Sequence, residues 1–73
     1  MKVDIDLLDK AIEDAGLSKE SFARSIGMDL STFYRKRQSN FEKLTVGEMH
    51  LAVEILNMSP KLASRIFLLQ NLQ

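Results

Sequence analysis

The side chains whose chemistry is most informative in this 73-residue chain are the basic ones between Ser18 and Lys43. This segment holds six lysines and arginines against three acidic residues, a net charge of +3, whereas residues 1–17 carry −3 and residues 44–73 balance. A local excess of guanidinium and ammonium groups suits a polyanionic partner such as nucleic acid. The alternative is an ordinary solvated surface, which most charged runs are. The cationic residues of the segment are Lys19, Arg24, Arg35, Lys36, Arg37 and Lys43.

No pattern for catalysis or for a bound ion accompanies these charges. The chain has no cysteine and a single histidine, His50, which favours a helix-boundary residue over a metal ligand or a base. Asp4, Asp6 and Asp9 lack the glycine and the closing glutamate of a calcium loop, so a capping, solvated face is expected. No nucleophile–base pair or phosphate-cradling glycine loop occurs. The sequence therefore predicts a protein that is not an enzyme, with no catalytic residue, metal, cofactor or evident small-molecule ligand.

The spacing of Ala23, Gly27 and Phe33 indicates how the charged segment folds. A small residue lets two helices cross closely, a glycine ends the first helix in the left-handed conformation, and a bulky residue anchors the second helix. Ser18 and Asp29 are the expected N-caps. The pattern predicts helices over roughly 19–26 and 30–37, joined by a tight turn.

An amphipathic helix is expected before this pair. Asp6 is its expected N-cap, Gly16 its end, and residues 1–4 a loosely packed lead-in. Apolar residues recur at helical spacing with charged residues between them. Those expected to face the core are Leu7, Leu8, Ala11, Ile12 and Ala15.

Two further helices are expected after a connector over 41–44, from which Phe41 and Leu44 should enter the core. Thr45 and Glu48 form a capping box for a helix that runs to about Leu56. Ser59 and Pro60 can begin a last helix, because a proline at the first helical position sacrifices no hydrogen bond; this helix is expected to run to about Leu69. The fourth helix is expected to bury Val46, Met49, Val53 and Leu56.

With this arrangement, residues 6–58 resemble the Cro/CI-type (XRE-like) helix-turn-helix family of phage and bacterial repressors. The resemblance implies an all-α fold, a compact bundle of about five short helices like the DNA-binding domain of lambda repressor. It also implies that the helix over about 30–37 lies in the major groove of DNA, where each base pair presents a distinct pattern of donors and acceptors.

The resemblance places five residues at outward, base-reading positions: Leu30, Ser31, Tyr34, Arg35 and Gln38. Arg35 can donate two hydrogen bonds to guanine, and Ser31 can reach a base or a phosphate. Tyr34 can stack on a sugar or a thymine methyl group, or donate its hydroxyl to a phosphate; alternatively it is a half-buried core residue. Many relatives carry a polar residue where this chain has Leu30, which contacts a thymine methyl group or packs in the core.

Phosphate contacts are expected at the start of the second helix and in and after the third helix. The candidates are Ser18, Lys19, Lys36, Arg37, Ser39, Asn40 and Lys43. For each of them the alternative is a solvent-exposed residue that aids solubility.

Together these features predict a single domain over residues 1–73, with a helix-turn-helix core at 19–38 and a C-terminal helix at about 60–70. The apolar excess from Ile66 to Leu72 predicts a homodimer through this helix. The expected function is sequence-specific regulation of transcription by a phage-type repressor that binds a palindromic operator in double-stranded DNA. The alternative is a protein–protein interaction module such as an antirepressor, favoured by the neutral total charge. No signal peptide or membrane-spanning run occurs, so the bacterial cytoplasm or nucleoid is the expected location.

Overall fold

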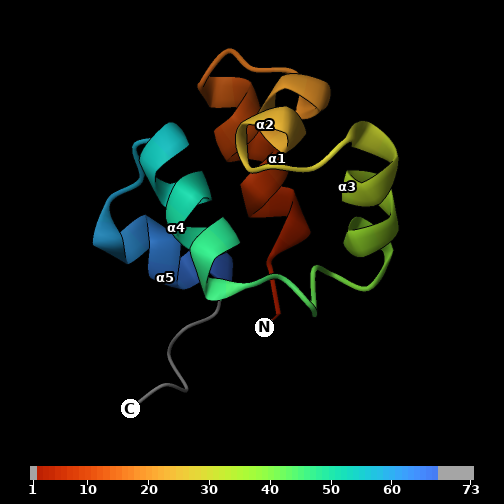
Figure 1. Cartoon of the computed structure of the whole chain (residues 1–73). Helices are drawn as coiled ribbons and strands as arrows, with labels where there is room; N and C mark the ends of the chain where they lie inside the picture. Colours follow the sequence, from red (N-terminus) through yellow and green to blue (C-terminus); the bar gives the residue numbers. More distant parts are fainter. Residues whose placement is uncertain (1, 68–73) are drawn as a thin grey trace.

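Residues 2–67, the part of the chain that the structure describes, fold into five α-helices in the computed structural model (Figure 1). The helices are α1 (Ile5–Asp14), α2 (Lys19–Ser25), α3 (Leu30–Gln38), α4 (Val46–Ile55) and α5 (Pro60–Phe67). No strand occurs among these residues, which confirms the expected all-α bundle. None of the described helices is both long and apolar enough to cross a membrane.

The first turn of each helix is held by a side-chain oxygen that accepts a backbone N–H. Ser18, Asp29, Thr45 and Ser59 cap α2 to α5 as predicted, and Thr45 and Glu48 form the full capping box. The cap of α1 is Asp4, whose Oδ1 accepts the N–H of Leu7 at 3.1 Å. The predicted cap, Asp6, is wrong: it lies exposed within the first turn of α1.

The segment before α1 is well packed, contrary to the expected loose lead-in. Val3 is only 2% exposed. Its N–H donates to the carbonyl of Asn40 at 3.1 Å, and the N–H of Asp4 donates to the carbonyl of Ile66 at 2.7 Å. An apolar side chain in the core and two satisfied backbone amides fix this segment between the loop after α3 and the last turn of α5.

Phe33 lies at the centre of an aromatic cluster and is fully buried. Its ring centroid lies 6.0 Å from Phe22 on α2, 5.2 Å from Phe41 on the connector and 5.7 Å from Tyr34 on α3. The predicted entry of Phe41 and Leu44 into the core is confirmed, with 1% and 9% exposure. The cluster therefore joins three elements at one place: α2, α3 and the connector that precedes α4.

Phe41 reaches this cluster from a left-handed backbone. Asn40 and Phe41 have φ values of 55° and 54°, and the N–H of Phe41 donates to the carbonyl of Lys36 at 2.9 Å. A non-glycine residue in this region costs about 1–2 kcal/mol. Burial of a phenylalanine side chain contributes roughly 1.5–3 kcal/mol, which offsets that cost.

Two residues expected in the core are exposed. Val46 is 60% exposed because it is the first residue of α4, and the core side chain at this entry point is Leu44 on the preceding connector. Ala15 is the C-cap of α1 and faces solvent beyond the last helical turn.

α5 contributes three buried residues, Ala63, Ile66 and Phe67. Ile66 and Phe67 are 0% and 1% exposed, so both belong to the core of this chain. The expected continuation of this helix to about residue 70, and the apolar residues Leu68 and Leu72, lie outside the described residues.

Candidate nucleic-acid interface

α2, the turn after it and α3 form a helix-turn-helix with the predicted anchors. Ala23 is completely buried, and the rings of Phe22 and Phe33 meet edge to face between the two helices. Gly27 has φ of 86°, the left-handed conformation expected at the end of α2, and Met28 is buried in the corner. This packing directs one face of α3 inward and leaves the opposite face open to solvent (Figure 1).

The open face of α3 carries four of the five predicted base-reading residues. Ser31, Tyr34, Arg35 and Gln38 are all exposed, and their spacing of three, four and seven positions places them along one stripe. We call these four residues the α3 stripe. Tyr34 is 44% exposed, with one edge of its ring against Phe33. The fifth residue, Leu30, is half-buried and packs against the core.

The N-terminal end of the stripe is held by Asp29. Its Oδ1 accepts the backbone N–H of Thr32 at 2.7 Å and the hydroxyl of Ser31 at 3.1 Å. The backbone hydrogen bond from Thr32 is the main cause that lowers the pKa of Asp29 below its ordinary value of 3.8, with smaller contributions from the side chains of Thr32, Ser31 and Arg35. The carboxylate is therefore ionised at neutral pH. It is also a hydrogen-bond acceptor beside the stripe that the base-reading prediction did not include.

The C-terminal end of the stripe borders a hollow. Tyr34, Arg37 and Gln38 line this hollow, which has a volume of about 260 Å³. Tyr34, Arg37 and Gln38 thus border a concave surface at the C-terminal end of α3.

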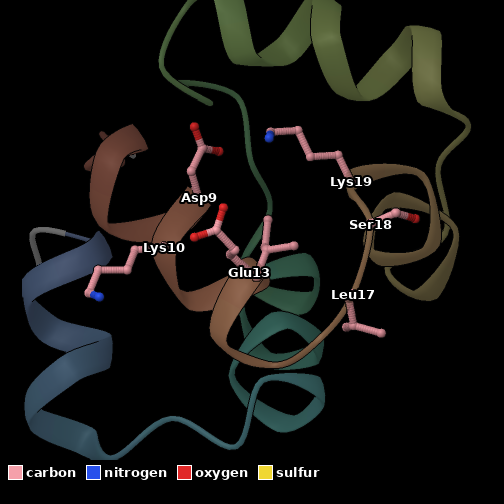
Figure 2. Close-up of a pocket in the computed structure, with 7 residues that line it drawn as sticks. Asp9, Lys10, Glu13, Leu17, Ser18 and Lys19 are labelled. Atoms are coloured by element: carbon pink, nitrogen blue, oxygen red, sulfur yellow. The ribbon is translucent and has the colours of Figure 1, made fainter.

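At the start of α2 the two phosphate candidates have different environments. Ser18 is exposed, and its hydroxyl oxygen already accepts the N–H of Ser21 at 3.0 Å. Lys19 is half-buried and borders a hollow of about 460 Å³ between α1 and α2. Figure 2 shows its ammonium group turned across this hollow toward the carboxylate of Asp9.

After the stripe, Lys36 and Arg37 are engaged within the protein. Lys36 Nζ lies 3.4 Å from Glu48 Oε2 on α4, and Arg37 Nη2 donates to Asp9 Oδ2 on α1. All four side chains are only 21–28% exposed. The sequence interpretation did not anticipate either pair, because the partners lie far apart along the chain.

The remaining phosphate candidates lie on the surface of the loop after α3. Ser39, Asn40 and Lys43 are all exposed. The hydroxyl of Ser39 donates to the carbonyl of Lys36 at 3.1 Å, while Asn40 occupies the left-handed turn. These three residues thus lie exposed in the loop that directly follows the two internally paired cations.

No group of three or more histidine or acidic side chains that could hold a metal ion occurs among residues 2–67. Comparison of the chain with protein-family models, with curated proteins and with solved structures found no match in any of the three.

Proposed function

We propose that this protein is a sequence-specific DNA-binding regulator of transcription that inserts α3 into the major groove. The observation that carries the proposal is the α3 stripe: four polar or amphipathic side chains exposed along one face of a helix whose other face is anchored by Phe33. The major groove of B-DNA, about 12 Å wide, admits an α-helix. Arg35 would donate two hydrogen bonds to guanine, and Ser31, Tyr34 and Gln38 would contact neighbouring bases or the sugar.

Backbone contacts would flank the stripe on both sides. Lys19 at the start of α2, and Asn40 and Lys43 after α3, would supply donors for phosphate oxygens, whereas the hydroxyl of Ser39 already donates to the carbonyl of Lys36. Each cation that neutralises a phosphate contributes about −0.9 to the slope of log affinity against log salt concentration. Because the proposed interface has few such cations and the chain is formally neutral, we expect the affinity for DNA to depend only moderately on salt concentration.

A homodimer on a palindromic operator completes the proposal, with one α3 in each of two successive major grooves. Half-sites one helical turn apart place these helices about 34–36 Å apart. Because Ile66 and Phe67 are used in the core, the second copy would dock through other residues. Such a repressor, of the phage type, would act in the bacterial cytoplasm or nucleoid by blocking access of polymerase to a promoter.

A second candidate is a protein–protein interaction module on the same fold, such as an antirepressor. The exposed apolar side chains on α4 favour it: Val46 is 60% exposed and Leu51 is 41% exposed. A partner would then contact one or both of these exposed apolar residues of α4, and α3 would not contact nucleic acid.

Selection from a pool of randomised duplexes, followed by sequencing at two salt concentrations, tests the proposal. We expect the wild-type protein to enrich one palindrome. Arg35→Ala should weaken its binding by roughly 5- to 150-fold, the equivalent of about 1–3 kcal/mol for a bidentate contact to guanine. Arg65→Ala on α5 is the matched control, since it removes an exposed arginine away from the stripe. No enrichment at low salt would contradict DNA reading and favour the α4-partner candidate.

A further inference from the structure

α3 has little apolar anchorage for a helix of nine residues. Phe33 is its one buried side chain, and Leu30 and Thr32 are half-buried. Leu30 packs against the core at the start of α3 and Phe33 at its centre, but no apolar side chain of the last turn is buried. Because apolar contact is non-directional, the orientation of this last turn depends on other contacts.

Two ion pairs hold the last turn of α3 from different sides. Arg37 Nη2 donates to Asp9 Oδ2 on α1, and Lys36 Nζ lies 3.4 Å and 3.5 Å from the two oxygens of Glu48 on α4. Successive residues of an α-helix point about 100° apart, so the two cations reach toward separate neighbours. Together the pairs connect α3 to both α1 and α4.

These pairs differ from the other two ion pairs in residues 2–67. Lys10–Asp14 and Glu20–Arg24 each lie within one helix, and their side chains are 59–75% exposed. Exposed pairs of this kind contribute little and cannot orient one helix against another. The pairs of Lys36 and Arg37 are half-buried and join helices, so loss of one partner leaves a charge in a poorly hydrated position.

Glu48 has two roles at once. Its Oε1 accepts the N–H of Thr45 at 3.0 Å in the capping box of α4, while its carboxylate pairs with Lys36. The N-terminus of α4 and the last turn of α3 thus share one side chain. Glutamine at position 48 would keep the capping acceptor and remove the charge.

We propose that Asp9 and Glu48 are positioning residues: they fix the tilt of α3 through Arg37 and Lys36, and by neutralising these cations they withdraw both from phosphate contact. Arg35, which makes no ion pair among residues 2–67, is then the cation of this turn that is presented outward. The withdrawal of Lys36 and Arg37 from phosphate contact rests on the proposed function, whereas the fixed tilt of α3 does not.

Amide hydrogen exchange of the full-length protein, without DNA, tests the positioning of α3. In the double variant Asp9→Asn/Glu48→Gln we expect protection in the last turn of α3 to fall about tenfold or more, with protection in α5 retained. The control is Glu20→Gln, which breaks an exposed pair on α2 and should leave the exchange of α3 unchanged. Unchanged protection of α3 in the double variant, or an equal fall in every helix, would overturn the proposal.

A charge reversal distinguishes positioning by Arg37 from direct contact with phosphate. The probe is the duplex that the wild-type protein enriches from the random pool. We expect Asp9→Lys and Arg37→Glu singly to weaken binding about tenfold or more, and the double variant to recover most of this loss with an unchanged salt slope. A double variant that stays weak, with a salt slope reduced by about 0.9, would show a phosphate contact and overturn the withdrawal of Arg37. If the wild-type protein enriches no duplex, the proposed function fails while the exchange experiment still decides the positioning.

Discussion

α3 and α5 are almost equal in length, nine and eight residues, but they are held in the fold by different forces. α5 buries Ala63, Ile66 and Phe67, whereas α3 buries only Phe33. α3 is instead fixed by a charged N-cap and by two ion pairs to neighbouring helices. Of these two helices, the one with less apolar anchorage is also the one with a polar stripe free for contact.

Truncation of the buried phenylalanine of each helix, Phe33 on α3 and Phe67 on α5, should have the largest effect on stability. Phe33→Ala and Phe67→Ala should each cost about 3–5 kcal/mol of unfolding free energy, because each removes a fully buried ring. Urea denaturation followed by circular dichroism measures the loss, with Leu51→Ala, at a 41% exposed position of α4, as the control. Where an alanine variant does not fold, the leucine variant replaces it. A loss below 1 kcal/mol for Phe33→Ala would mean that α3 does not depend on this anchor.

Removal of the α5 cap tests the contribution of a neutral capping group. Ser59→Ala should destabilise the protein by about 1 kcal/mol, since the N–H of Leu62 loses its acceptor. Thermal unfolding measures the change. Ser64→Ala, on an exposed position of the same helix, should have almost no effect and serves as the control.

The cap of α3 should respond to pH, and that of α5 should not. The pKa of Asp29 is lowered in the folded protein, so its stabilising contribution is complete above the ordinary value of 3.8 and is lost as the pH falls through the lower folded-state pKa. We expect the wild-type protein to lose more stability than Asp29→Asn between about pH 4 and pH 2, because asparagine caps without titrating. Parallel curves of stability against pH for the two proteins would contradict this.

The smallest effect is expected at the exposed start of α4. Val46→Gln should change the unfolding free energy by less than about 0.5 kcal/mol, because Val46 makes little contact in the folded chain. Val53→Gln, a half-buried position on the same helix, should cost clearly more. If Val46→Gln lowers the stability in a concentration-dependent manner, this face of α4 is covered by a second copy.

The local features of the helix-turn-helix were predictable from the sequence because their partners are close in the chain. Asp29, Gly27 and the Thr45–Glu48 box each act within four residues, where spacing alone determines the geometry. The stripe followed from the position of Phe33, which fixes the inward face of α3.

The features that were missed depend on tertiary contacts. Arg37 was predicted as a phosphate contact, but its pairing with Asp9 arises only when α1 packs beside the end of α3. Val3 likewise enters the core because Asn40 and Ile66 supply acceptors from distant parts of the chain. Spacing carries no information about such partners.

On α4, the apolar spacing predicted burial of Val46, Met49, Val53 and Leu56. The structure buries Ala52 instead, with Met49, Val53 and Leu56 partly buried against the core and Val46 exposed in the first turn.

The hydrogen bond from Asp4 to Ile66 makes the path of the backbone nearly circular. Its donor precedes α1 and its acceptor lies in the last turn of α5, so the two ends of the described region meet with 2.7 Å between nitrogen and oxygen. A short linker from residue 67 back to residue 2 would close the ring at little entropic cost. A circularly permuted chain opened in the turn between α4 and α5 would run from α5 through α1 and end with α4. We expect this permuted chain to keep the packing of the five helices.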